Sequence, residues 1–169
     1  MTAKSSVVEI GVAEGGSAVV LREAMSPSGT LWLIDPFHLS RVRAINATRR
    51  AAHRVVGGCK NGTVVWIDRF SFDASRDWHN KIDFLFVDGD HSEKGVQRDW
   101  EDWHRFVVPG GLVAFHDAAL FPGGWTKPDW GPVRMVDRLF RANSLPEWRI
   151  AQQVDSLVVV ERLLGGRVR

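Results

Sequence analysis

Acidic and imidazole side chains gather in two short stretches of the sequence, residues 87–91 (VDGDH) and 115–117 (FHD). Each stretch follows an apolar run that is typical of a strand, and the carboxyl ends of parallel strands meet at one edge of a sheet. We therefore expect Asp88, His116 and Asp117 to lie together. Carboxylate oxygens with one imidazole can bind a divalent cation, and the sequence predicts Mg2+ or Mn2+ there.

Other roles stay open for the polar residues of these stretches. Asp90 or Ser92 could cap the helix that follows, and His91 could hydrogen-bond nearby backbone. Without a metal, His116 or His91 becomes the candidate general base, because an imidazole with its ordinary pKa of about 6.5 can take a proton at neutral pH.

A glycine-containing turn follows the first apolar run, where residues 9–17 are EIGVAEGGS. Its glycines let the backbone approach a ligand at the start of a helix. The dinucleotide motif G-x-G-x-x-G would place its second glycine at Ala13, and the flanking Glu9 and Glu14 would repel a pyrophosphate. A ligand with a cationic amino group and no phosphate, such as S-adenosylmethionine, suits this turn better. A turn that needs glycine only for its own geometry is the alternative.

Two later strand ends extend this candidate cofactor site. Asp35 ends the second apolar run, where it could accept hydrogen bonds from both ribose hydroxyls or cap the turn before Pro36. Ser71 and Phe72 follow the third run and offer a hydroxyl and an aromatic face for an adenine ring. Aromatic residues at such a position also serve simply as part of a core.

The pattern of apolar runs predicts an α/β fold. Strands are expected at residues 7–10, 30–34, 63–67, 82–87, 112–115, 148–151 and 157–160. Helices are expected at 17–25, 40–56 and 93–107, with a weak segment after Phe72. Because strands and helices alternate, we expect a Rossmann-like, doubly wound, mostly parallel sheet, and the short last connection predicts an antiparallel hairpin. Residues 118–132 are rich in Pro and Gly and predict an irregular segment long enough to be a lid.

Composition indicates a single domain over residues 1–163, with a flexible tail at 164–169. The chain has 169 residues, a formal net charge of +2 and one cysteine. The early Glu9 argues against a secretory signal, and no apolar run could span a membrane, so we expect a cytoplasmic protein without a membrane partner. The slight charge also argues against nucleic acid as a partner, although five arginines gather on the second predicted helix: Arg41, Arg43, Arg49, Arg50 and Arg54.

Four stretches together carry a resemblance to a known family: VVEIGVAEGGSA, LWLIDPF, FLFVDGDHSEKGVQRDW and VPGGLVAFHD. They resemble the class I S-adenosylmethionine-dependent methyltransferases from about residue 7 to residue 161. Within that class they are similar to the cation-dependent O-methyltransferases of catechol, caffeoyl-CoA, macrolide-sugar and cephalosporin-pathway type.

This resemblance implies a cofactor site. Glu9, Gly11 and Ser17 would surround the methionine part of the cofactor, and Asp90 would lie near its amino group. In cation-dependent members, a residue at the position of Asp88 is both a metal ligand and a candidate base. The cofactor-binding residues expected in this chain are Glu9, Gly11, Ala13, Gly15, Ser17, Asp35, Ser71, Phe72, Asp88, Asp90 and His91.

The sequence departs from this family pattern in two places. His116 stands where cation-dependent members carry a carboxylate, which leaves open whether a metal is needed and which one. Relatives also carry helices before their first strand, whereas here a strand is expected from residue 7. The site is then either open or completed by another subunit, and we expect a homodimer.

The resulting hypothesis is O-methylation of a small-molecule hydroxyl of sugar, phenol or natural-product type. The acceptor would be positioned for in-line transfer and deprotonated by Asp88, His116 or His91, with Trp125 and Trp130 as candidate stacking surfaces. Three alternatives are a nucleotide or NAD-binding Rossmann module, an RNA methyltransferase or RNA-binding module, and a family member that binds the cofactor without turnover.

Overall fold

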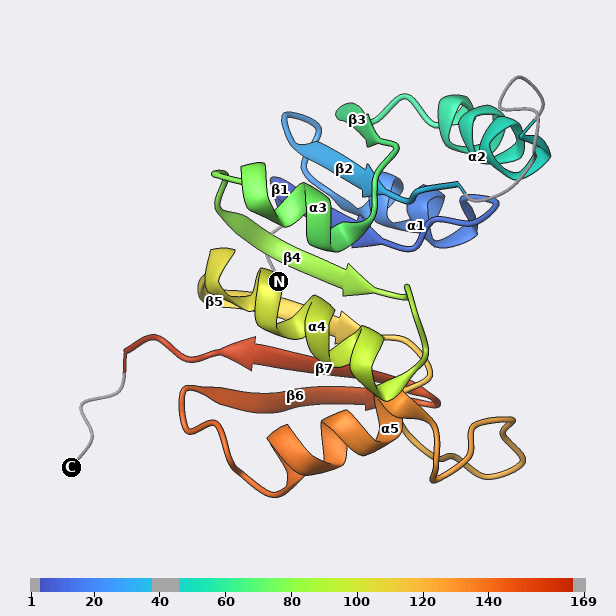
Figure 1. The fold of residues 1–169 in the computed structure, drawn as a ribbon. Helices are drawn as coiled ribbons and strands as arrows, with labels where there is room; N and C mark the ends of the chain where they lie inside the picture. Colours follow the sequence, from blue (N-terminus) through green and yellow to red (C-terminus); the bar gives the residue numbers. More distant parts are fainter. Residues whose placement is uncertain (1–3, 38–45, 166–169) are drawn as a thin grey trace. The chain divides into compact units, whose positions relative to one another are not determined.

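The computed structural model describes residues 4–37 and 46–165 and divides into two compact units (Figure 1). Unit 1 comprises residues 1–78 and unit 2 comprises residues 79–169. Each unit combines parallel strands with helices, as the alternation of strand and helix patterns predicts.

Unit 1 has three parallel strands in the order β3-β2-β1. They are β1 (Ser6–Ile10), β2 (Thr30–Ile34) and β3 (Thr63–Ile67), all within a residue of their predicted positions. Successive side chains of a strand point to opposite faces. Leu31 and Leu33 are therefore fully buried on one face of β2, while Trp32 on the other face meets the ring of Trp78 edge-on at 5.2 Å.

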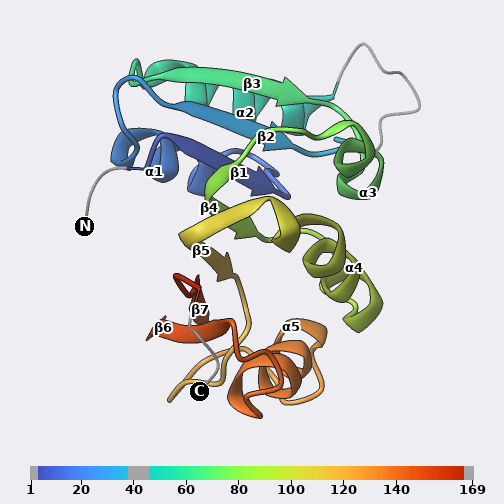
Figure 2. The ribbon, with the colours of Figure 1, turned by 90° about the vertical axis from the view of Figure 1, so that its left-hand side faces the viewer.

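The helices of unit 1 are α1 (Gly16–Ala24), α2 (Ala47–Gly58) and the short α3 (Ser71–Ala74). A 3-10 turn, Ser75–Asp77, follows α3. A Cβ atom added at Gly15 would lie 3.1 Å from the Cα of Ala52 in α2, so α1 begins in close contact with α2 (Figure 2). The predicted helix over 40–56 has residues 40–45 outside the described residues, and the described helix begins after an Asn46 cap, which accepts a 2.9 Å hydrogen bond from the Arg49 N–H.

Unit 2 has four strands in the order β4-β5-β7-β6. The first pair, β4 (Ile82–Val87) and β5 (Val107–Phe115), is parallel. The strands β6 (Trp148–Val154) and β7 (Leu157–Arg162) form an antiparallel hairpin, and β7 pairs antiparallel with β5. The predicted Rossmann-like class with an antiparallel end is thus confirmed.

The largest error in the predicted elements lies before β5. The predicted helix 93–107 stops earlier, because α4 (Glu93–Trp103) passes into a 3-10 turn, His104–Phe106, and Val107 already belongs to β5. The Pro-Gly-Gly sequence at residues 109–111 does not exclude strand structure. A register shift absorbs it, since Ile82 pairs with Val107 and Phe84 with Leu112.

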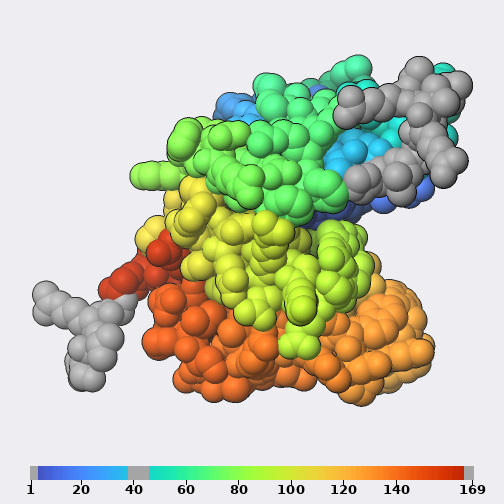
Figure 3. Space-filling model, viewed as in Figure 1, coloured from blue at the N-terminus to red at the C-terminus, as the bar shows by residue number. Residues whose placement is uncertain are grey.

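One helix was not predicted. Residues 118–132 were expected to be irregular, but α5 (Gly131–Val136) begins within them and continues into a π-helical turn, Asp137–Arg141. A proline in the first turn of this helix is a recognised start signal that periodicity alone overlooks. The helices α4 and α5 lie side by side in unit 2 (Figure 3). The Trp100 ring of α4 meets the ring of Phe140, in the π-helical turn, edge-on at 5.0 Å.

Within residues 4–37 and 46–165, none of the helices has the length and apolar character that a bilayer crossing requires.

Candidate active site

The turn between β1 and α1 is built from left-handed backbone. Gly11, Ala13 and Gly15 have φ angles of 84°, 44° and 86°. Ala13 therefore adopts a conformation that residues with a side chain seldom do. Its neighbours are held by backbone hydrogen bonds, from Gly11 N–H to Ile34 O at 2.9 Å and from Gly15 N–H to Val12 O at 2.8 Å. The sequence prediction of a tight glycine turn at the start of a helix is confirmed. We call residues 11–16 the glycine turn.

The carboxylate of Asp35 holds this turn in place. Its Oδ2 accepts hydrogen bonds from the N–H groups of Val12 at 2.8 Å and Ala13 at 3.0 Å. Its Oδ1 accepts from the N–H of Phe37 at 2.6 Å, which is the turn cap considered as an alternative to ribose binding. Two turn N–H groups that could receive a phosphate are thus engaged by a negative charge. A dinucleotide pyrophosphate would find these donors already occupied, and the Asp35 carboxylate would repel it.

Glu9 and Ser17 join the end of β1 to the first turn of α1. Glu9 is fully buried, and its Oε1 accepts a hydrogen bond from the Ser17 hydroxyl. After β3, the predicted adenine-binding residues Ser71 and Phe72 lie in α3. The Phe72 ring is stacked on that of Phe70 at 5.0 Å, and Phe70 is 39% exposed. These residues keep a cofactor role as a prediction.

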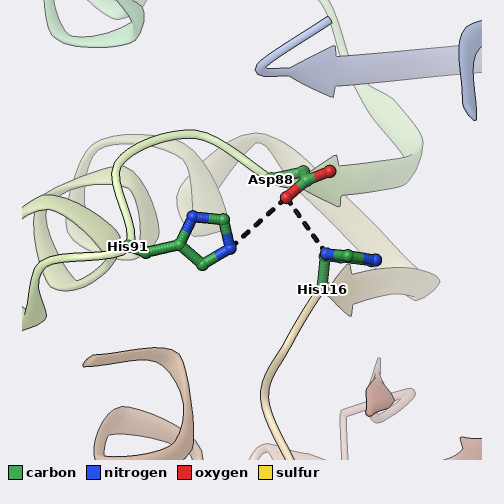
Figure 4. Close-up of side chains that lie close together, drawn as sticks. All are labelled: Asp88, His91 and His116. Atoms are coloured by element: carbon green, nitrogen blue, oxygen red, sulfur yellow. Dashed lines mark ion pairs between the residues drawn. The ribbon is translucent and has the colours of Figure 1, made fainter. Parts of the chain in front are cut away.

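Unit 2 brings four polar side chains together beyond the ends of β4 and β5, namely Asp88, His91, His116 and Asp117, and we call them the polar cluster. Figure 4 shows both imidazoles directed at Asp88, whose Oδ1 lies 3.2 Å from His116 Nδ1 and 3.5 Å from His91 Nε2. The Oδ2 of Asp117 lies 3.5 Å from each imidazole. One ligand atom from each of Asp88, His91 and His116 falls within 4.8 Å of the others, a spacing that one metal ion can bridge.

The start of α4 positions His91. Ser92 is the N-cap and accepts a hydrogen bond from Gly95 N–H at 3.0 Å, while Asp90 accepts from both the N–H and the hydroxyl of Ser92. The capping role considered for Asp90 and Ser92 is therefore present, and a contact of Asp90 with the cofactor stays a prediction. Gly131 of α5 lies against this segment, because a Cβ atom there would be 2.5 Å from His91 O.

The charges around His116 raise its pKa above the ordinary value of 6.5. The largest cause is the interaction of Nδ1 with the Asp88 carboxylate. Burial lowers the pKa by less, and the negative charges of Asp88 and Asp117 each raise it by a still smaller amount. His116 is therefore cationic over a wider pH range than a free histidine. It must lose this proton before it can bind a metal ion or act as a base.

The sequence did not indicate how Asp117 is held. Its φ angle is 50°, and its Oδ1 accepts a 2.8 Å hydrogen bond from the indole N–H of Trp125. Trp125 was considered as a stacking residue, but no local pattern in the sequence points to this bond. The structure also places His91 beside the residues predicted as metal ligands. The three-residue spacing between Asp88 and His91 could have indicated this position.

Comparison with known proteins identifies the family. A family model described as "Methyltransferase domain" matches residues 8–118, well over half of the chain. The chain therefore belongs to this methyltransferase family, which confirms the membership inferred from its motifs.

Individual relatives are more distant. An uncharacterized protein, R132, of Acanthamoeba polyphaga mimivirus is 29% identical over 115 residues, which are 65% of this chain. The chain spans about half (50%) of the length of that relative.

Among solved structures, the O-methyltransferase TomG of Streptomyces achromogenes, involved in tomaymycin synthesis and bound to S-adenosylmethionine, has a TM-score of 0.69 at 16% identity. The match covers 95% of this chain and 74% of TomG. An rRNA methylase of Streptococcus thermophilus has a TM-score of 0.65 at 11% identity, with 97% and 90% covered. Identities this low show a shared fold.

Proposed function

We propose that the chain binds S-adenosylmethionine and transfers its methyl group to a hydroxyl of a small molecule, assisted by a divalent cation at the polar cluster. One observation carries the proposal: in a member of a methyltransferase family, two carboxylates and two imidazoles converge beyond β4 and β5. The O-methyltransferase TomG shares the fold, which supports oxygen as the accepting atom.

The geometry of unit 1 favours S-adenosylmethionine over NAD. The N–H groups of Val12 and Ala13 bind Asp35, so the glycine turn offers these donors to no phosphate. S-adenosylmethionine has no phosphate, and its cationic groups suit a turn flanked by carboxylates. We assign the methionine part to the region of Glu9, Gly11 and Ser17, and the ribose to Asp35.

The donor set of the polar cluster suits a cation that accepts both nitrogen and oxygen. Mg2+ is bound mainly by oxygen, whereas Mn2+ and other transition metals also accept imidazole. We therefore place Mn2+ ahead of Mg2+, with Asp88, His91 and His116 as ligands and Asp117 as a further candidate. A cation bound there would supply Lewis acidity that lowers the pKa of an acceptor hydroxyl.

The residues of the cluster can hold and move the acceptor proton. When bound, S-adenosylmethionine supplies an electrophilic methyl group on a sulfonium. Asp88 presents a carboxylate oxygen that can accept the proton of an acceptor hydroxyl. When His116 does not ligate a cation, its Nδ1, 3.2 Å from Asp88, can share that proton. Because the carboxylates raise the pKa of His116, the neutral form that this step needs is reached only at a higher pH than in a free histidine.

Calorimetric titration tests the proposal. S-adenosylmethionine, S-adenosylhomocysteine and NAD are titrated into the protein, each with and without Mn2+ or Mg2+. We expect both adenosyl ligands to bind and NAD not to bind. Mn2+ should bind the wild-type protein. Its affinity for the His91→Ala and His116→Ala variants should be lower by roughly tenfold or more, because each variant lacks one proposed ligand. Binding of NAD alone would contradict the proposal.

Nucleic acid is the competing acceptor, because an rRNA methylase shares the fold and α2 carries arginines. Of these, Arg49 forms an ion pair with Asp68 at 2.8 Å, which leaves less of its charge for phosphates. Tight RNA binding that weakens steeply with salt would favour this alternative.

We further propose that the protein acts in the cytoplasm as a homodimer, with residues 1–163 as the working domain. Light scattering of the purified protein measures the subunit number, and a monomer that is fully active would contradict the dimer.

A further inference from the structure

A tryptophan next to the polar cluster is both exposed and held in place. Trp125 is 58% exposed, although its indole N–H is engaged by Asp117 Oδ1 at 2.8 Å. The other oxygen of Asp117 lies 3.5 Å from His91 and from His116. A single carboxylate group thus separates the open indole from both imidazoles.

A tight turn supports the indole from one side. Gly124 N–H donates to Phe121 O at 3.0 Å across the Pro122-Gly123 pair, which closes a β-turn. The Phe121 ring packs on Gly124, where a Cβ atom would lie 2.3 Å from the ring, and it meets the Trp125 ring edge-on at 5.0 Å. Removal of the indole would leave this turn otherwise intact.

The start of the same segment is tied to the hairpin of unit 2. Ser156, in the turn between β6 and β7, is buried, and its carbonyl accepts hydrogen bonds from Ala118 N–H at 2.7 Å and Ala119 N–H at 3.1 Å. The Thr126 hydroxyl donates to Ala119 O at 2.7 Å. The lid expected from the composition of residues 118–132 is therefore, around Trp125, a hydrogen-bonded platform.

Such a platform has the properties of a ligand-contact surface. An exposed aromatic ring offers a flat apolar face, and a side chain that is already ordered loses little entropy when a ligand packs on it. Trp125 lies outside residues 8–118, the part that the family model matches.

We propose that Trp125 is the stacking platform for the methyl acceptor. The acceptor's hydroxyl is carried on a ring with a flat apolar face, as in a phenol or a pyranose, and this face lies on the indole beside the polar cluster. The indole N–H has a second role, because its bond to Asp117 positions that carboxylate beside the histidines. The identification of the ring as the acceptor rests on the proposed function, whereas ring binding itself does not.

The test separates the indole face from the indole N–H. Catechol and methyl glucopyranoside are titrated at millimolar concentration, with metal removed, into wild type, Trp125→Phe and Trp125→Ala, and the affinity is followed by NMR. We expect at least one ring to bind, with an affinity about tenfold lower in Trp125→Ala and within about threefold of wild type in Trp125→Phe, which keeps an aromatic face. If Trp125→Ala lowers the affinity for catechol alone, the acceptor is phenolic. If it lowers the affinity for the glucoside alone, the acceptor is a sugar.

The second role is read from Mn2+ affinity in the same variants. Trp125→Phe lacks the N–H and should bind Mn2+ more weakly, by roughly threefold to tenfold, while it still binds the ring. Leu164→Ala, which alters a side chain that is 74% exposed elsewhere, is the control and should match wild type in both titrations.

The outcomes distinguish the two proposals. The platform is contradicted if neither ring binds wild type, if Trp125→Ala binds as tightly as wild type, or if glycerol, which has no ring, shows the same dependence on Trp125. Failure of the wild-type protein to bind S-adenosylmethionine contradicts the proposed function and leaves the ring titrations interpretable. Thermal melts of each variant confirm that the fold is retained.

Discussion

The glycine turn of unit 1 and the polar cluster of unit 2 both depend on aspartates, but the partners of these aspartates differ. Asp35 accepts hydrogen bonds from three backbone N–H groups, which cannot change their charge. Asp88 faces the imidazoles of His91 and His116, which can change their charge by gaining or losing a proton. The first arrangement is therefore a rigid support, and the second can respond to protons, metal ions and an acceptor.

Two histidines show the same contrast. His53 in α2 stacks on Trp66 at 3.8 Å, and burial, with the nearby Arg49 cation, lowers its pKa. His116 lies among carboxylates, which raise its pKa. Identical side chains thus take opposite pKa shifts, and of these two histidines only His116 lies beside carboxylates of the polar cluster.

The strongest test of this contrast is Asp88→Ala. We expect methyl transfer to fall by about 10²-fold to 10⁴-fold, because the variant lacks the carboxylate that we propose accepts the acceptor proton and binds the cation. Binding of S-adenosylmethionine, measured by calorimetry, should weaken less than in Asp35→Ala, because the proposed cofactor contacts of unit 1 are retained. A variant that retains full activity would show that the cluster is not catalytic.

Asp35→Ala should have the opposite signature. Three hydrogen bonds to a charged acceptor are lost and the turn loosens, so affinity for S-adenosylmethionine should fall by roughly tenfold to a hundredfold. Mn2+ binding should be unchanged. Asp68→Ala, which removes an exposed partner of Arg49, is a matched control with near wild-type cofactor affinity expected.

The contact between α5 and the polar cluster can be broken by one methyl group. Gly131→Ala places a Cβ atom 2.4 Å from Glu93 N and 2.5 Å from His91 O, so we expect a loss of about 1–3 kcal/mol in the free energy of unfolding. Denaturant titration measures it, and weaker Mn2+ binding should accompany it.

Gly57→Ala is the control for this substitution. It lies in α2 with no atom within 4 Å of its added Cβ, so it should be neutral or slightly stabilising. Equal destabilisation of the two variants would contradict the packing assigned to Gly131.

The smallest expected effect is the pH dependence that His53 contributes. Its folded pKa is lower than 6.5, so the unfolded chain binds more protons between these two values. The contribution of His53 to the free energy of unfolding is therefore fully present above pH 6.5 and is lost as the pH falls through this interval. Denaturant titrations at several pH values around the ordinary pKa, about 6.5, measure this contribution. In His53→Gln the free energy of unfolding should depend less on pH there. A pH dependence equal to that of wild type would contradict the lowered pKa of His53.

Local patterns predicted most of the fold. The strands β1 to β4 and the hairpin were placed from apolar runs and short connections, because alternation and strand length are properties of neighbouring residues. The start of β5 was missed because Pro109 and two glycines resemble a break, and only pairing with β4 shows that they belong to a strand. The helix α5 was missed because it is short.

The candidate site was predictable to the same extent. Asp88, His116 and Asp117 were expected together because strand ends of a parallel sheet share an edge, and they do lie together. His91 was named as a base and a cofactor contact, but its place beside both aspartates depends on the turn that Ser92 caps.

The sequence by itself determined the class of fold, the family and the residues able to do chemistry, because these follow from side-chain type and short-range spacing. Only the tertiary structure decided what those residues touch. Asp35 reaches back 23 residues to support the glycine turn, and Trp125 returns to bind Asp117. The first contact joins residues 23 apart and the second closes a loop between residues eight apart, and no local pattern encodes either.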